Sequence, residues 1–118
     1  MTQLEFAKKN IVTALMRRIS SFEGLDPRFI VKGIKEGKIV ILLNKLHRIK
    51  KPCAVGSGVR TKINANIGTS TDKVRIDDEI KKLKAAQKYG ADTVMDLSVG
   101  GNLGEIHNRI RAVFLRCI

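Results

Sequence analysis

The spacing of apolar residues predicts three helices and a strand in the first 43 residues. The first helix is expected over 3–9, because Thr2-Gln3-Leu4-Glu5 has the form of a capping box. A second helix is expected over 11–22. A third begins at Asp26-Pro27, where Asp caps the helix and Pro suits its first position. The apolar run Ile39–Leu43 then predicts a buried strand.

The second half of the chain repeats a strand followed by a helix. Polar and apolar residues alternate from Lys62 to Ile67, which predicts a strand with one polar face. A helix over 75–89 follows, with acidic residues in its first turns and lysines later, as the helix dipole favours. A second strand is predicted over 93–97 and a second helix over 103–115. This order predicts a βαβα unit with parallel strands.

The predicted fold class is α/β, or α+β over the whole chain, with N-terminal helices and a short strand before the βαβα unit. Residues 1–60 are expected to form a helical, basic region and residues 61–118 the βαβα part, together as one folding unit. Two parallel strands neither complete a sheet nor close a barrel. Self-association into a homo-oligomer is therefore expected, because it would cover the exposed sheet.

Charge and composition narrow the class of protein. Residues 1–62 carry 14 Lys and Arg against 4 Asp and Glu, whereas residues 63–118 carry 9 against 7. A basic half attracts phosphate groups, and Gly56-Ser57-Gly58 can present backbone amides to one. The alternatives are a solvated basic face and an ordinary loop. No apolar run approaches the roughly 20 residues of a membrane span, and the N-terminus lacks a signal-peptide pattern, so a cytoplasmic protein with no membrane partner is expected.

The ends of the two predicted strands carry the candidate chemistry. Ligands of parallel α/β folds gather at the carboxyl ends of strands. The first end, Asn66-Ile67-Gly68-Thr69-Ser70, offers a carboxamide that donates and accepts hydrogen bonds, with two hydroxyls. The second, Asp96–Gly101 with Met95 before it, offers a carboxylate, a hydroxyl and two glycines whose amides can face an anion.

Each of these residues also has a structural interpretation. Asn64 and Asn66 can form a side-chain network within the sheet, and Met95 can fill a gap in the core. Asp96 can act as an acid or base, orient a hydroxyl, or cap the following loop. The two histidines, His47 and His107, have no His, Cys or carboxylate at ligand spacing, so both are expected to be surface or capping residues. The two cysteines, Cys53 and Cys117, have neither disulfide-framework nor metal-site spacing and are expected to be reduced.

Two segments carry a family resemblance. The first is Arg60–Ser70, which reads Arg-Thr-Lys-Ile-Asn-Ala-Asn-Ile-Gly-Thr-Ser, and the second is Tyr89–Ser98, which reads Tyr-Gly-Ala-Asp-Thr-Val-Met-Asp-Leu-Ser. With Met1–Ala7 and Asp26–Val40, they resemble the ThiC family of phosphomethylpyrimidine synthases over most of residues 1–106.

The resemblance implies a fold, an activity and a site. Members of this family convert 5-aminoimidazole ribotide into hydroxymethylpyrimidine phosphate, the pyrimidine half of thiamine, by radical chemistry. They use S-adenosylmethionine, a [4Fe–4S] cluster and a divalent metal, on a (β/α)8 barrel that follows a smaller N-terminal region. Two substrate-binding positions of the family fall on Asn66 and Met95. The βαβα unit would then be the truncated start of such a barrel.

The departures from the family qualify this interpretation. Its other substrate ligands, its metal-binding histidines and its Cys-x-x-Cys-x-x-x-x-Cys motif have no counterpart, and neither Cys53 nor Cys117 maps to that motif. We therefore expect no catalytic residue, metal or cofactor in this chain, which would be a truncated or frameshifted product or a diverged remnant, inert alone. The alternative is a non-catalytic basic module for a phosphorylated metabolite, a partner protein or nucleic acid. Nucleic acid is disfavoured, because only 4% of residues are aromatic and no reader motif is present.

Overall fold

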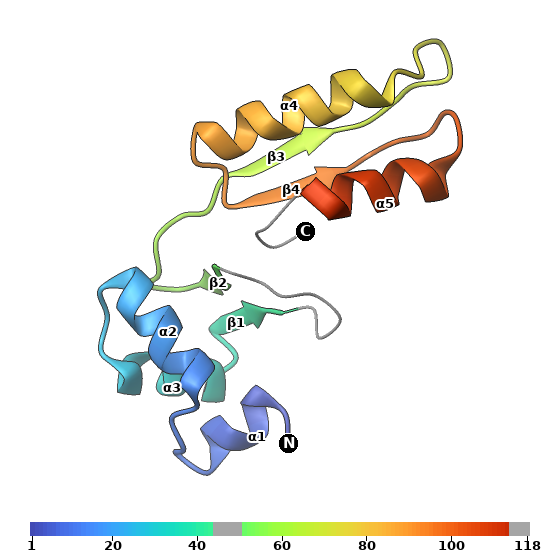
Figure 1. The fold of residues 1–118 in the computed structure, drawn as a ribbon. Helices are drawn as coiled ribbons and strands as arrows, with labels where there is room; N and C mark the ends of the chain where they lie inside the picture. Colours follow the sequence, from blue (N-terminus) through green and yellow to red (C-terminus); the bar gives the residue numbers. More distant parts are fainter. Residues whose placement is uncertain (44–50, 114–118) are drawn as a thin grey trace. The chain divides into compact units, whose positions relative to one another are not determined.

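The computed structural model describes residues 1–43 and 51–113. These residues fall into two compact units (Figure 1): the first contains residues 1–43 and 52–61, and the second contains Lys51 and residues 62–113. Both units combine helices with strands, which confirms the mixed fold class. None of the described helices combines the length and the apolar character needed to cross a bilayer.

The first unit contains three helices and two strands, and the three predicted helices are confirmed. Its elements are α1 (Gln3–Lys8), α2 (Ala14–Glu23), α3 (Pro27–Lys35), β1 (Ile39–Leu42) and β2 (Cys53–Gly56). The capping box at Thr2 forms as expected. The second helix begins later than predicted, because Thr13 is its N-cap and the Thr13 hydroxyl accepts from the Met16 amide at 3.2 Å.

The β1 strand pairs with a strand that its sequence pattern does not reveal. β1 and β2 are antiparallel, with Val40 opposite Val55. Of the four β1 residues only Ile39 is buried, so the expectation of a wholly buried strand was wrong and the strand is two-sided. β2 lies in the basic stretch with no clear periodicity, and its own residues, Cys53–Gly56, are apolar or glycine throughout, so they show no alternation. The Ser57 amide donates to the Lys38 carbonyl at 2.9 Å, so this Gly-x-Gly amide is used within the fold.

The core of the first unit is aliphatic. It is formed by Ala7, Met16, Ile19, Ile30, Val31, Ile34, Ile39 and Ala54. Its members come from all three helices and both strands, so each element has one face committed to the same apolar interior. Burial of Ile, Val and Met side chains stabilises such a unit by about 1.5–3 kcal/mol each.

The second unit is the predicted βαβα arrangement. Its elements are β3 (Asn64–Ile67), α4 (Ile76–Lys88), β4 (Thr93–Asp96) and α5 (Leu103–Val113). β3 and β4 are parallel, and the register places Asn64 beside Thr93 and Asn66 beside Met95. The predicted helices and strands are confirmed to within a few residues at their ends.

Both helices of the second unit pack on the same face of the two-stranded sheet. Ile67 and Val94 point to this face and meet Leu83 of α4 with Ile106 and Ile110 of α5. Figure 1 shows α4 and α5 running alongside β3 and β4. The opposite face, which carries the intervening residues of each strand, is therefore not covered by the unit's own helices.

Candidate functional site

The uncovered face of the β3–β4 sheet is polar. The Thr93 hydroxyl donates to the Asn64 side-chain oxygen at 2.9 Å, and the Asn64 amide nitrogen donates to the Asn66 oxygen at 3.1 Å. This chain of hydrogen bonds leaves the N–H donors of Asn66 Nδ2 without a protein partner among the described residues. A carboxamide held in this way is ready to donate to a bound molecule.

The structure brings Asn66 and Met95 together. They are direct neighbours in the parallel register and lie on the same uncovered face. Asn66 is exposed and Met95 is 50% exposed, so the core-packing interpretation of Met95 does not hold within the described residues. A hydrogen-bond donor beside a flexible thioether can bind a ligand that has both a polar atom and an apolar surface. The network interpretation of Asn64 and Asn66 is also correct, since the two side chains are bonded to each other.

The loop after β3 is held by a buried carboxylate. Glu79 of α4 is 4% exposed, and its Oε2 accepts from the Gly68 amide at 2.8 Å. Its Oε1 accepts from Lys82 Nζ at 2.7 Å, which pairs the buried charge. A Cβ on Gly68 would lie 2.6 Å from the Leu97 carbonyl carbon, so glycine is required for the close approach of the two strand ends. Sequence patterns gave no signal for the role of Glu79, because its partner Gly68 lies eleven residues away in the loop after β3.

Asp96 holds the loop after β4. Asp96 Oδ1 accepts from the Ser98 amide at 3.0 Å and from the Ser98 hydroxyl at 2.6 Å. The same hydroxyl oxygen accepts from the Thr69 amide at 3.1 Å, and the Thr69 hydroxyl donates to the Gly100 carbonyl at 2.7 Å. The structure therefore supports two of the three interpretations of Asp96, which orients a hydroxyl and caps its own loop.

His107 is less isolated than its sequence context suggests. His107 is exposed, which agrees with the expectation of a surface residue, and its Nδ1 lies 3.7 Å from Asp96 Oδ2 of β4. The two residues meet because α5 folds back along β4. Cys53 is buried in β2, whereas His47 and Cys117 lie outside the described residues.

The pair Gly100-Gly101 has packing roles in the structure. A Cβ on Gly100 would collide with the Ser70 backbone oxygen, so this residue is needed where the two loops touch. The N-terminus of α5 is capped by the Asn102 side chain, whose oxygen accepts from the Glu105 amide at 3.2 Å. The structure thus gives this segment a role in joining the loops, independent of any anion.

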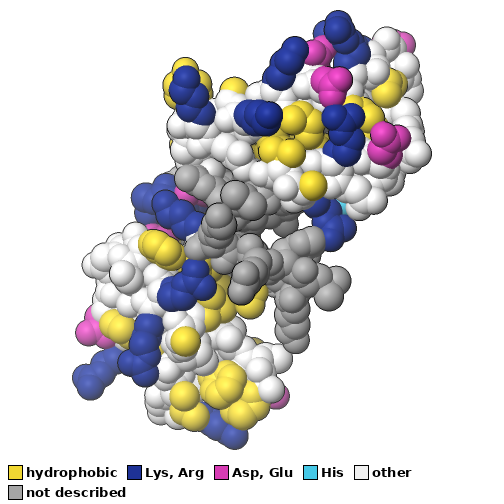
Figure 2. All heavy atoms as spheres, in the orientation of Figure 1, with side chains coloured by type: hydrophobic (Ala, Val, Ile, Leu, Met, Phe, Trp, Pro, Cys, Tyr) yellow, Lys and Arg dark blue, Asp and Glu magenta, His cyan; other side chains and the backbone are white. Residues whose placement is uncertain are grey.

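The basic side chains of the first unit are spread over its surface. Figure 2 shows Lys and Arg as separate groups among hydrophobic and uncharged atoms on the face that it draws. Lys32 and Lys38 flank Glu36, at 3.9 and 2.7 Å, and Lys35 donates to the Asn10 side chain at 3.3 Å. These contacts fit the interpretation of a solvated basic face.

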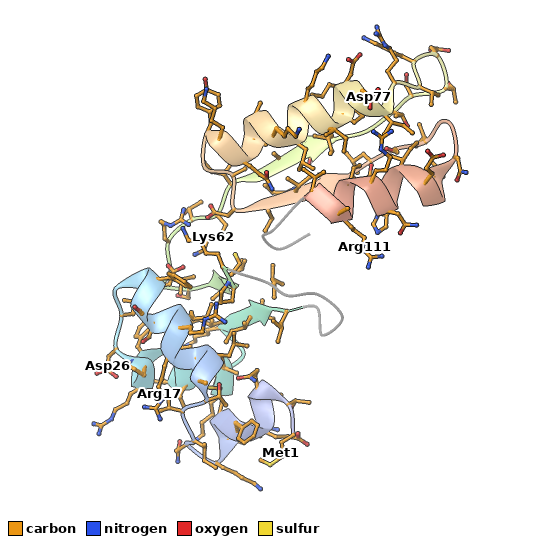
Figure 3. All side chains as sticks on the ribbon, viewed as in Figure 1. Met1, Arg17, Asp26, Lys62, Asp77 and Arg111 are labelled. Atoms are coloured by element: carbon orange, nitrogen blue, oxygen red, sulfur yellow. The ribbon has the colours of Figure 1, made fainter. Side chains whose placement is uncertain are left out.

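Within the described part of the chain, no three His, Cys, Asp or Glu side chains gather as metal ligands. The ion pair that joins the two helices of the second unit is Asp77 with Arg109, at 2.8 Å, and Asp77 is labelled at the start of α4 in Figure 3. It lies on the helix side of the sheet and not beside Asn66. The functional side chains of the uncovered face are therefore polar and neutral, apart from Met95.

These features define a class, an α/β protein whose candidate ligand site lies at the ends of parallel strands. Comparison with known proteins gives the family. The model of the radical SAM ThiC family matches residues 2–116, and the chain belongs to this family.

Several curated relatives carry the name phosphomethylpyrimidine synthase. The chain is 54% identical to the Pyrococcus abyssi protein over 110 residues, which are 93% of this chain and 26% of the relative. It is 52% identical over 110 residues to a Dehalococcoides mccartyi protein, with the same coverage of 93% and 26%. It is 47% identical over 117 residues to the Geobacter metallireducens protein, covering 99% of this chain and 27% of the relative. The chain thus spans about a quarter of the length of these relatives.

Proposed function

We propose that this chain acts in the biosynthesis of the thiamine pyrimidine, as the N-terminal part of a phosphomethylpyrimidine synthase. Its contribution is one wall of the substrate site, formed by Asn66 and Met95 for 5-aminoimidazole ribotide. The observation that carries the proposal is their adjacency on the uncovered face of parallel strands, within a chain that belongs to the ThiC family.

The two residues have different roles in this proposal. Asn66 donates a hydrogen bond from Nδ2 to a polar atom of the ribotide, because its oxygen is already bonded to Asn64. Met95 contacts an apolar surface, for which the imidazole ring is the natural candidate. Neither side chain changes its charge with pH, so both act by binding and orientation and not by proton transfer.

The family uses S-adenosylmethionine, an iron–sulfur cluster and a divalent metal. The described residues do not offer a ligand set that fits either the cluster or the metal. This proposal therefore assigns substrate contacts alone to the described residues, and we expect no turnover from the 118-residue chain by itself. Lyase chemistry and a cytoplasmic location belong to the same proposal and rest on the family and on the curated relatives.

A chimeric enzyme tests the proposal directly. The 110 matching residues of this chain would replace their counterparts in the Pyrococcus abyssi relative, and the product would be assayed anaerobically with reconstituted cluster, S-adenosylmethionine and 5-aminoimidazole ribotide. We expect turnover from the chimera. Asn66→Ala should lower kcat/KM about 10-fold or more, which corresponds to the loss of one hydrogen bond in a binding site. The matched control is Asn108→Ala, an exposed asparagine on α5, which should leave kcat/KM within about twofold.

Two results would contradict the proposal. One is a folded, cluster-loaded chimera without activity, and the other is an Asn66→Ala variant as active as Asn108→Ala. Should the chimera be insoluble, nuclear magnetic resonance of the 118-residue chain provides a second measurement. Millimolar 5-aminoimidazole ribotide should then shift the side-chain amide signals of Asn66 and the methyl signal of Met95, while the signals of Asn108 stay in place.

A further inference from the structure

Hydrogen bonding between the two strand ends continues beyond the strands themselves. The ladder proper ends at Ile67 and Asp96. The Leu97 amide then donates to the Ile67 carbonyl at 2.8 Å, and the Val99 amide donates to the Thr69 carbonyl at 2.9 Å. Between these two bonds, the Thr69 amide has the Ser98 hydroxyl as its acceptor, at 3.1 Å. A side chain thus takes the place of a backbone carbonyl in the middle of the extended ladder.

The Ser98 hydroxyl can fill this place only if its proton points elsewhere. A hydroxyl has one proton and two lone pairs. The Ser98 proton is committed to Asp96 Oδ1, at an oxygen–oxygen distance of 2.6 Å, which is short for a neutral donor and typical of a carboxylate acceptor. The lone pairs are therefore left to face the Thr69 amide. Asp96 also accepts from the Ser98 backbone amide, so both the position and the orientation of the hydroxyl depend on it.

Asp96 itself lies on the opposite side of the sheet from the candidate site. It is in register with Ile67, whose side chain is in the core beneath the helices, whereas Asn66 and Met95 point to the uncovered face. Its side chain is 9% exposed, and its Oδ2 lies 3.7 Å from His107 Nδ1 of α5. From this side Asp96 cannot touch a ligand that lies on Asn66, so an acid or base role there is excluded by the alternation of the strand.

We propose that Asp96 is a positioning residue for the substrate site: through the Ser98 hydroxyl it fixes the Thr69 amide, and with it the spacing of the two strand ends that carry Asn66 and Met95. A Cβ on Gly68 would lie 2.6 Å from the Leu97 carbonyl carbon, so the two strand ends are already in close contact. The ligand part of this inference rests on the proposed function, whereas the hydrogen-bond relay does not.

Hydrogen exchange on the full 118-residue chain tests the relay without any ligand. Asp96→Ala and Ser98→Ala should each speed exchange of the Thr69 amide by roughly 10-fold, because each removes or misorients its acceptor. The Leu97 amide, which is bonded to a backbone carbonyl, should change by less than about twofold. Asp96→Asn keeps an acceptor oxygen for Ser98 and should restore protection of Thr69, as should Ser98→Thr. The matched control Asp72→Ala, an exposed aspartate in the β3–α4 loop, should leave Thr69 unchanged.

General destabilisation would give a different pattern, because exchange at Leu97 and in the core would then rise together with that of Thr69. That pattern, or unchanged protection of Thr69 in Asp96→Ala, would overturn the relay. Should Asp96→Ala fail to fold, the comparison of Ser98→Ala with Ser98→Thr decides the same question.

The chimera with the remainder of the Pyrococcus abyssi relative tests the consequence for the site. Asp96→Ala should lower kcat/KM for 5-aminoimidazole ribotide by about 3- to 10-fold, with Asp96→Asn close to the unsubstituted chimera. Faster Thr69 exchange with unchanged kcat/KM would refute the positioning role while leaving the proposed function intact. An inactive chimera would instead count against the proposed function, and the exchange data on the relay would still stand.

Discussion

The two units of this protein differ in how they use buried polar side chains. In the first unit the buried polar residue among those described is Ser20, whose hydroxyl donates to the Arg17 carbonyl of the same helix at 3.1 Å. In the second unit Glu79 and Thr69 are buried, and they bond to Gly68 and Gly100, eleven and thirty-one residues away. One unit satisfies its buried polar group within a turn of helix, and the other uses such groups to join separate segments.

This difference supports the proposal that the second unit carries the ligand site. A buried charged or hydroxyl group lowers stability unless all its hydrogen-bond partners are in place. A satisfied network of such groups holds the segments that it joins in one arrangement. In the second unit the network surrounds the strand ends next to Asn66 and Met95. The first unit relies on an aliphatic core and helix caps, and its long-range side-chain bonds are exposed or half-buried, such as that from the Arg60 amide to Glu23 at 2.8 Å.

The largest expected effect tests whether the two units are alike in their apolar cores. Leu83 and Ile30 are both fully buried, one in each unit. Leu83→Ala and Ile30→Ala should each lower the free energy of unfolding by about 2–5 kcal/mol, because each leaves a cavity as well as losing burial. Val40→Ala, at a position that is 56% exposed, should cost less than about 1 kcal/mol. Urea denaturation measures all three, and a cost near zero for either core variant would show that its unit does not depend on the cluster described.

A smaller change in stability tests the difference between the buried polar groups of the two units. Glu79→Ala leaves the Gly68 amide without its carboxylate acceptor, so we expect a loss of about 1.5–3 kcal/mol in the free energy of unfolding. Ser20→Ala removes a bond within one helix and improves helix propensity, so its cost should stay below about 0.5 kcal/mol. Equal costs for the two variants, measured by urea denaturation, would remove the contrast between the units.

The sequence predicts the regular elements well where local signals are strong. The caps at Thr2 and Asp26 and the alternation from Lys62 to Ile67 each led to an element that the structure contains. The β2 strand was missed because Cys53–Gly56 are apolar or glycine throughout and so show no alternation, and because its pairing with β1 is a tertiary contact. The burial of β1 was overestimated for a related reason, since an apolar run does not reveal that one side of the strand lacks a covering layer.

The candidate site could be predicted only in part. Strand periodicity placed Asn66 and Met95 near the strand ends, and the parallel topology brought them into one register. The residues that hold the loops, Glu79 and Ser98, gave no signal, because each acts on an amide in a segment distant along the chain. The contact of His107 with Asp96 was missed for the same reason, since ligand spacing in sequence says nothing about α5 folding back along β4.

The smallest expected effect concerns the local caps of the first unit and depends on pH. The Thr2 backbone amide, and after it the Thr2 hydroxyl, hold the pKa of Glu5 below its ordinary value of 4.5. A lowered pKa in the folded state means that ionised Glu5 stabilises α1 at pH values above 4.5, and that this contribution is lost as the pH falls through the lowered value.

Thermal unfolding between pH 3 and pH 7 should therefore show a small advantage of the unsubstituted chain over Glu5→Gln at neutral pH that shrinks in acid. Thr2→Ala removes the hydroxyl of the capping box, so the same comparison made in that background should give a smaller pH dependence. A difference that grows as the pH falls would have the wrong sign for a lowered pKa. Such a result would show that the capping box does not stabilise the charged form of Glu5. The hydrogen bond between Glu5 and the Thr2 amide would then not contribute to the stability of α1.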